Sequence, residues 1–371
     1  MCTRWRLTLL GLALLLAVLP LPDGVVEAAY TNGVYPFIQA VVTTVSNLVP
    51  IALFDVLVVG VVVGWLALLL RDVRRRPWRT TLGRLVRRTA TLAAVLYLAF
   101  LAVWGLNYRR VPLEDRLQLS YRAVTPAAAE RLARTAVTEL NRLYPARQMT
   151  LGDGTGETMG NTMTGRATGA PGASLVPALA SVQAQLEAPR PIVPGRPKRT
   201  LLDWYFRAAS VDGMTDPFFL ETLTLSTLLP IERPIVIAHE WAHLAGYADE
   251  GEANFVGWLT CMRGDARARY RGWLFLYREV AASLTPADRV GLVTIPRGGP
   301  SAELTGNLAS VREALGRVGQ LTRRPLGCTL HERQLLAGRS QLRALRLALL
   351  ATGGFRRLEF ARQSAGGFLQ P

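Results

Sequence analysis

The chain has 371 residues, 50% of them hydrophobic, and a formal net charge of +16. Its three cysteines are too few for a disulfide framework or a cysteine-rich zinc site, which excludes both classes of protein. The positive charge is concentrated between residues 71 and 88, where eight arginines stand against one aspartate. We interpret this stretch as a solvated loop beside anionic lipid, and we expect no nucleic-acid binding.

Three apolar runs lie in the first 106 residues. A membrane-spanning helix needs roughly 20 apolar residues, with about 17 as the lower limit. The run at residues 50–70 meets this length and the run at 89–106 meets it narrowly, whereas the first run, 7–22, is shorter. We predict that the first run is a retained anchor, with a signal peptide cleaved after Ala28 as the alternative. Residues 1–106 are therefore predicted to be a membrane region.

The arginine-rich loop also predicts the orientation of these spans. Short loops rich in arginine stay in the cytoplasm, so residues 71–88 and the N-terminus are predicted to be cytosolic. Residues 23–47 and everything after Asn107 would then lie outside. The expected location is a bacterial cell membrane, crossed several times, with an extracytoplasmic domain. Asp55 lies near the outer end of the second span, where we expect a helix-start or interfacial role.

Residues 107–371 have the composition of a globular domain that can bury its own core. Pro126–Tyr144 is predicted to be an amphipathic helix, capped by Thr125 and ended by Pro145. A flexible Gly/Thr-rich insertion is predicted at residues 151–173. Alternation in the stretch 220–225, "LETLTL", predicts a strand. Further helices are predicted at residues 174–188, 253–262, 268–283, 306–321 and 330–351. The fold class is thus mainly α with a small β-sheet, preceded by transmembrane helices.

The stretch "AHEWAH" contains two of the chain's three histidines. On a helix, residues four apart share a face, so His239 and His243 can direct their imidazoles at one metal ion. A catalytic zinc ion has three protein ligands and keeps one position for water, and Glu240 stands where a general base can reach that water. The surrounding residues are apolar, so these polar groups would be buried without a partner unless a metal satisfied them. Charged residues bound this apolar stretch after about a dozen residues, which is too short for an intramembrane site.

Three carboxylates that follow can supply the third ligand. Asp249 stands ten residues after His239, as in the HExxHxxGxxH/D arrangement, with Gly246 allowing a turn. If a second helix begins near Asp249, that residue is a natural N-cap and Glu250 shares a face with Ala253 and Asn254. Glu252 would then point about 200° away from Glu250, so the two would not bind the same ion. The geometry favours Glu250 and leaves Glu252 and Asp249 as alternatives.

The segments "WGLNYRR", "PFFLET" and "HEWAHLAGYADEGEANF", together with three N-terminal spans, resemble a bacterial domain-of-unknown-function family. Its members are described as membrane-anchored, zincin-like metallopeptidases. The resemblance covers most of the chain and is weakest over residues 152–198 and after Cys328. The family segment after HExxH reads like "xxGxxxEDEANF", which matches Glu250 and Glu252 and counts against Asp249 as a ligand. Gly251 departs from the acidic residue usual there.

The resemblance implies a zincin-like α+β domain and a zinc ion held by His239, His243 and Glu250, with Glu240 as the catalytic base. The expected function is a membrane-anchored zinc metallopeptidase, with peptide or protein substrates and the lipid bilayer as partners. The alternatives are a non-catalytic membrane protein with a structural zinc site or binding surface, and hydrolysis of a non-peptide amide. In a zincin fold, residues 220–225 would be an edge strand that pairs with substrate.

Several other side chains are candidates for supporting roles. Glu221 is expected to cap a turn, with ordering of the site as the alternative. Tyr108, Tyr247 and His331 are candidate oxyanion or proton donors, although capping is the expected role of His331. Cys261 and Cys328 either pair or remain buried thiols.

Overall fold

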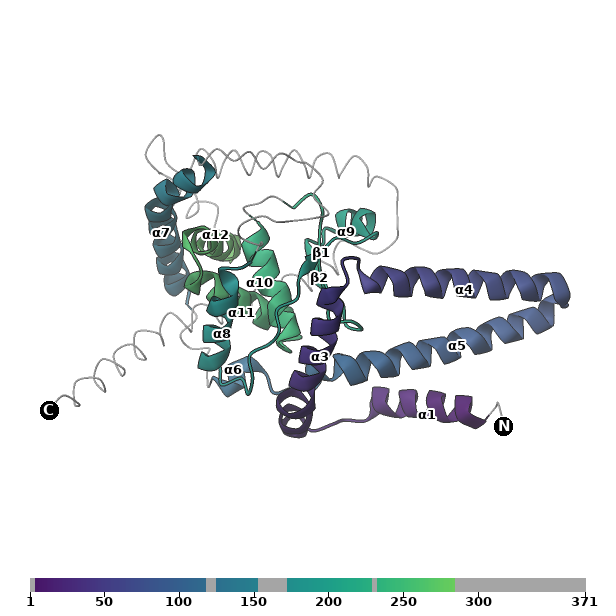
Figure 1. Cartoon of the computed structure of the whole chain (residues 1–371). Coiled ribbons are helices and arrows are strands. Elements are labelled where there is room, and N and C mark those ends of the chain that lie inside the picture. The colour runs from purple at the N-terminus through teal and green to yellow at the C-terminus, as the bar shows by residue number, and fades with distance from the viewer. Residues whose placement is uncertain (1–3, 118–124, 153–171, 229–231, 284–371) are drawn as a thin grey trace. The chain divides into compact units, whose positions relative to one another are not determined.

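The computed structural model describes residues 4–117, 125–152, 172–228 and 232–283, and the chain in these ranges is mainly helical with one small sheet (Figure 1). The elements are α1 (Arg4–Val18), α2 (Asp23–Val25), η1 (Val26–Val34), α3 (Tyr35–Leu48), α4 (Leu53–Arg75), α5 (Trp78–Val103), η2 (Gly105–Arg109), α6 (Leu113–Arg116), α7 (Pro126–Gly152), α8 (Leu175–Gln185), β1 (Pro197–Lys198), α9 (Asp203–Ala209), β2 (Gly213–Thr215), β3 (Thr222–Thr224), α10 (Arg233–Leu244), α11 (Glu250–Arg263) and α12 (Ala266–Ser283).

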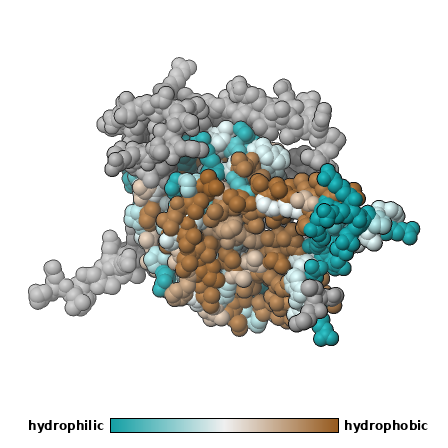
Figure 2. Space-filling view, turned by 45° about the vertical axis from the view of Figure 1, so that its right-hand side comes forward, coloured by the Kyte–Doolittle hydropathy of each residue, from teal (hydrophilic) through white to brown (hydrophobic). Residues whose placement is uncertain are grey.

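Among the described residues, two helices are long and apolar enough to cross a membrane, α4 and α5, and they form a long hairpin (Figure 1). α1 and the stretch Asp23–Leu48 would add a third span if they count as one element, although the two are bent by 113°. Only 6% of the most apolar part of α4 is buried, as expected for a helix that contacts lipid. Figure 2 shows the broad hydrophobic surface that results, bounded by hydrophilic side chains. These features are consistent with a membrane anchor.

The turn between α4 and α5 is held by an ion pair. Asp72 is buried, and its carboxylate lies 2.6 Å from Nη1 of Arg88 and 3.8 Å from Nε of Arg76. Trp65 on α4 also donates to Thr89 on α5. Part of the arginine-rich stretch therefore neutralises one buried carboxylate and ties the two helices together.

The chain divides into two compact units, and the first unit comprises residues 1–111, 187–227 and 243–248. Its sheet has the strand order β1-β3-β2, with β1 parallel and β2 antiparallel to β3. The prediction that residues 220–225 form an edge strand is therefore wrong, because both sides of β3 are already paired. Local alternation of side-chain types indicates that a segment is extended, but it does not show how many neighbouring strands pair with that segment. β3 has no open edge for a substrate strand.

Beside β3, Glu221 and Lys198 form a buried ion pair, with 2.5 Å between the Lys198 Nζ and a carboxylate oxygen. The Glu221 carboxylate also accepts from the backbone N–H groups of Leu53 and Phe54, both at 3.0 Å. It thus caps the first turn of α4, where unpaired N–H groups and the helix dipole favour an anion. The expected structural role for Glu221 holds, although the element that it caps is a helix and not a turn.

Asp55 also lies in the first turn of α4, as the sequence predicts. Its two carboxylate oxygens accept from the Thr200 hydroxyl at 2.6 Å and from the Leu201 backbone N–H at 2.8 Å. The buried cluster of Ala52, Phe206 and Leu223 packs next to it. The start of α4 is therefore joined to the segment that leads into α9.

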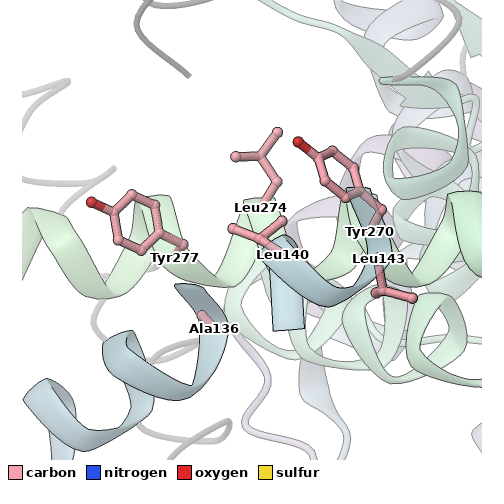
Figure 3. Packing of buried hydrophobic residues seen from close by; sticks show 6 residues of the cluster. All are labelled: Ala136, Leu140, Leu143, Tyr270, Leu274 and Tyr277. Atoms are coloured by element: carbon pink, nitrogen blue, oxygen red, sulfur yellow. The ribbon is translucent and has the colours of Figure 1, made fainter. Parts of the chain in front are cut away.

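The second unit comprises residues 112–186, 228–242 and 249–371, and its described part is helical. α7 and α12 pack through a cluster of buried side chains, which are Ala136, Leu140, Leu143, Tyr270, Leu274 and Tyr277 (Figure 3). Thr125 accepts from the Ala128 N–H and caps α7 as predicted. The helix then runs to Gly152, past Pro145, where the prediction ended it. Proline removes one backbone hydrogen bond, and here that loss does not end the helix.

The helices predicted at 174–188, 253–262 and 268–283 are present as α8, α11 and α12. The helices predicted at 306–321 and 330–351, and nearly all of the insertion at 151–173, lie outside the described residues.

Candidate metal centre

The two predicted histidine ligands lie on one continuous helix, α10. Pro234 stands in its first turn, where a missing N–H costs no hydrogen bond. The helix ends where Gly246 adopts a φ of +83° and donates its N–H to the His243 carbonyl oxygen at 2.9 Å. A Cβ at Gly246 would lie 3.0 Å from the Asn107 amide oxygen, so the turn after the helix needs glycine for its conformation and for space.

α11 begins directly after this turn, capped by Asp249. The Asp249 carboxylate accepts from the backbone N–H groups of Gly251 at 2.9 Å and Glu252 at 3.2 Å. The predicted N-cap is therefore confirmed. Because the capping oxygen is directed at the helix end, Glu250 becomes the first residue of α11.

α11 lies very close to α10. A Cβ added at Gly257 would be 2.9 Å from the His239 backbone nitrogen and 3.0 Å from its Cα. Ala253, one turn earlier, is fully buried. Small residues at these positions let the two helix backbones approach, and this places Glu250 against His239. The packing role of Gly257 was not identified from the sequence, although its four-residue spacing from Ala253 would place both small residues on one face of a helix.

The ligand atoms of His239, His243 and Glu250 all lie within 4.8 Å of one another. One carboxylate oxygen of Glu250 is 3.3 Å from Nε2 of His239. Two imidazole nitrogens and one carboxylate oxygen are the donor set of catalytic zinc sites that keep an open position. The Glu250 side chain is 61% exposed and that of His239 18% exposed, so the cluster is accessible from solvent.

The three remaining acidic candidates have different surroundings. Glu240 is buried on α10, one residue after His239. Glu252 is buried as well, and its carboxylate accepts from the Leu113 N–H at 2.7 Å, where α6 begins. The structure thus gives Glu252 and Asp249 hydrogen bonds to helix N-termini and brings Glu250 to the two histidines.

The orientation of the His243 ring is fixed by a backbone acceptor. Nδ1 of His243 lies 2.8 Å from the carbonyl oxygen of Tyr247. A carbonyl oxygen only accepts, so Nδ1 carries the proton and Nε2 carries the lone pair. Metal-binding histidines commonly have this arrangement, in which the second nitrogen donates to a carbonyl or carboxylate. Trp104 packs edge-on against the same ring, with 6.1 Å between ring centroids.

Side chains from residues 27–110 hold the end of α10. Trp104 Nε1 donates to the His243 carbonyl oxygen at 3.0 Å, and the Tyr35 hydroxyl donates to that of Leu244 at 2.7 Å. Carbonyl groups in the last turn of a helix have no partner within the helix, so such donors satisfy them. The second histidine is therefore positioned by the same unit that carries the apolar helices.

Arg110 extends this support to the turn after α10. Its guanidinium donates to both carboxylate oxygens of Glu27, at 2.9 and 3.0 Å, and to the Gly246 carbonyl oxygen at 3.0 Å. It also lies over the Tyr247 ring, 4.7 Å from the ring centroid. Tyr247 is the residue whose carbonyl accepts from His243. Arg110 is thus connected to the histidine through one residue.

The other candidates have different surroundings or lie outside the described residues. The Tyr108 side chain is 62% exposed, and Tyr247 is buried with its ring against Arg110. Cys261 is a buried free thiol, and burial raises its pKa well above the ordinary value. His331 and Cys328 lie outside the described residues, so a role for His331 stays a prediction.

A helix with two histidines one turn apart, followed by a capped helix that presents a glutamate, defines a candidate metal centre in a protein with apolar helices. A family model matches residues 30–312, and the chain belongs to that family, described as protein of unknown function (DUF3810). The matched range contains all four proposed site residues and the side chains that support His243. No curated protein and no solved structure matches the chain.

Proposed function

We propose that this protein is a membrane-anchored zinc metallopeptidase. The observation that carries the proposal is the convergence of His239, His243 and Glu250, with Glu240 following the first of them on the same helix. Clusters of acidic groups are common without a metal. A pair of imidazoles with one nitrogen fixed by a carbonyl is a stronger indication, because this geometry leaves the other nitrogen ready to bind.

His239, His243 and Glu250 would hold the ion. A bound zinc ion would polarise the scissile carbonyl and acidify a water molecule. Glu240 would take the proton from that water and pass it to the leaving amine. Its burial fits this role, since a carboxylate with restricted hydration is a better base. The zincin-like fold implied by the family resemblance belongs to this proposal as well.

We further propose that the metal centre lies outside the cytoplasm of a bacterial cell. The arginines between α4 and α5 support a cytosolic position for that turn, so the opposite ends of both helices would face outward. Asp55 and Glu221 cluster at the start of α4, where a bilayer ends and charged groups are tolerated. Substrates would then be extracytoplasmic peptides or proteins.

The competing function is a structural zinc site on a non-catalytic membrane protein. Structural zinc usually has four protein ligands and no adjacent base. Three converging ligand groups, the exposure of Glu250 and the presence of Glu240 favour catalysis.

The test uses the full chain in detergent, because residues 27–110 hold the end of α10. We expect about one zinc ion per chain after purification without chelator. We also expect cleavage of a pool of fluorogenic peptides, which stops when zinc is removed and returns when it is added. Protein that binds zinc without cleaving any peptide of a broad pool would favour the structural alternative. Protein without zinc would contradict both.

A further inference from the structure

The start of α9 and the two residues before it carry large apolar side chains that the rest of the described chain does not cover. Leu201 is 70% exposed, Trp204 66% and Tyr205 52%, and all three lie within five consecutive residues. Exposed aromatic residues gathered in one short segment indicate a surface that contacts something other than water.

The opposite side of α9 is firmly attached to the protein. Phe206 is buried in a cluster with Ala52 and Leu223, and Phe54 packs against that cluster. Asp203 accepts from the Ser226 N–H at 2.7 Å and from its hydroxyl at 2.8 Å. These contacts hold the helix in one orientation, with Trp204 and Tyr205 directed away from the core.

The attachment also fixes the level of α9 along α4. Ala52 and Phe54 flank the first residue of α4, and Asp55 accepts from the Leu201 N–H. With a rise of about 1.5 Å per residue, the 23 residues of α4 extend about 35 Å, slightly more than the ~30 Å hydrocarbon thickness of a bilayer. A bilayer that is spanned by α4 would therefore have the end of its hydrocarbon region near the first turn of this helix.

We propose that residues 201–209, which are α9 and the two residues before it, form an interfacial segment, whose exposed residues Leu201, Trp204 and Tyr205 lie in the headgroup region of the bilayer beside the start of α4. Tryptophan and tyrosine have an apolar ring and a polar group, and they are enriched at this level. The exposed apolar surface of α4 begins with Val56, the residue after Asp55, whose carboxylate accepts from the Leu201 N–H. Arg207, exposed on α9 and paired with Asp203, adds a cation suited to phosphate groups.

This proposal does not depend on the metal centre. Its consequence is that the chain returns to the membrane surface at residues 201–205. Phe206 also connects this contact to β3, which carries Leu223 in the same cluster. The sheet would then be held at a fixed level above the bilayer by α4 and α9 together.

The experiment measures the depth of spin labels in the full chain, reconstituted in liposomes of phosphatidylethanolamine and phosphatidylglycerol. Single cysteines replace Leu201 or Trp204 in a chain that also carries C2S and C328S, since the thiol of Cys261 is buried. Val63→Cys on α4 gives the mid-bilayer reference, and Thr135→Cys on the exposed side of α7 gives the aqueous reference.

We expect labels at positions 201 and 204 to be several-fold more accessible to oxygen, and several-fold less accessible to a water-soluble nickel chelate, than the label at Thr135. Accessibilities equal to those of Thr135 would overturn the proposal. Dipolar broadening between labels of two chains would overturn it as well, by assigning the surface to a second copy. A label at Val63 that is not accessible to oxygen would show that α4 does not span the bilayer, and the proposal would then fail. The site at Leu201 gives an independent result if the change at Trp204 prevents folding.

Discussion

The Nδ1 atom of His243 lies 2.8 Å from the carbonyl oxygen of Tyr247, four residues further along the chain. This contact exists because α10 ends at Leu244 and the chain turns at Gly246, so that the Tyr247 carbonyl comes back to the ring. Arg110 holds that turn through the Gly246 carbonyl oxygen. The candidate ligand is therefore oriented by residues that do not touch the metal position, and this makes the support testable apart from the ligands.

Arg110→Lys tests that support. Lysine is a point charge without the planar group that pairs with both oxygens of Glu27, bonds to Gly246 and covers Tyr247. We expect zinc affinity to fall about 10- to 100-fold, as for other residues that orient metal ligands. Competition with a chromophoric chelator measures it. Arg134→Lys, at an exposed ion pair on α7, is the matched control. Unchanged zinc affinity in a folded Arg110→Lys protein would show that Arg110 does not position His243.

Gly257→Ala tests the close approach of α10 and α11. The new methyl group would lie within 3.0 Å of the His239 backbone, so the helices must separate. Overpacking of this kind typically costs about 1–3 kcal/mol, and we expect a lower melting temperature together with weaker zinc binding. Gly83→Ala, where a Cβ meets nothing within 4 Å, should leave zinc binding unchanged and should not lower the melting temperature, because alanine has the higher helix propensity. A Gly257→Ala protein with native stability and native zinc binding would contradict the packing argument.

Three matched substitutions separate the acidic residues. Glu250→Gln removes the anionic donor, and we expect zinc to be lost. Glu252→Gln keeps an oxygen that can accept from Leu113, and Asp249→Asn keeps a good N-cap, so both variants should retain zinc. Metal analysis of the three purified proteins decides between them. The assignment of Glu250 fails if its glutamine variant keeps zinc while either of the others loses it.

Asp216 predicts a pH dependence of stability. It is fully buried, and its pKa is raised to about 7. Burial is the main cause of this rise and the charge of Glu221 adds to it, whereas hydrogen bonds from Phe218 and Phe219 and the charge of Lys198 lower the pKa. The folded chain thus holds a proton that the unfolded chain releases near pH 4. This contribution to stability is present below about pH 4 and is lost as the pH rises towards 7.

Melting curves between pH 4.5 and 7.5 check this dependence on wild type and Asp216→Asn. Wild type should lose roughly 2–4 kcal/mol relative to the asparagine variant as the pH rises. Asp115→Asn, at an exposed position, controls for the removal of one charge. Parallel curves for wild type and Asp216→Asn would show that Asp216 is ionised throughout.

Local sequence patterns predicted the parts of the site that lie on one or two adjacent helices. His239 and His243 share a face because of helical periodicity, and Asp249 caps α11 because a carboxylate before a helix accepts its free N–H groups. The contact of Tyr35 with Leu244 joins residues 209 apart in the chain, and that of Arg110 with Gly246 joins residues 136 apart. No periodicity relates such residues.

The central position of β3 was missed for a related reason. Its partners, β1 and β2, are two and three residues long, too short for any alternation to appear. Glu221 was assigned a structural role without its partners, because Lys198 and the start of α4 are brought to it only by the fold. Sequence patterns predicted which side chains of α10 and α11 come together, while the contacts that hold the ends of these helices depend on the tertiary structure.

The central claim is that Glu240 acts on a substrate at a metal held by His239, His243 and Glu250. The most direct measurement is peptide hydrolysis, together with zinc content, for full-length wild type and Glu240→Gln purified in parallel. Glutamine has nearly the same size and cannot take up a proton, so we predict about one zinc ion per chain in both proteins and hydrolysis in wild type alone. Equal hydrolysis by the two proteins, or wild type that binds no zinc, would contradict the account.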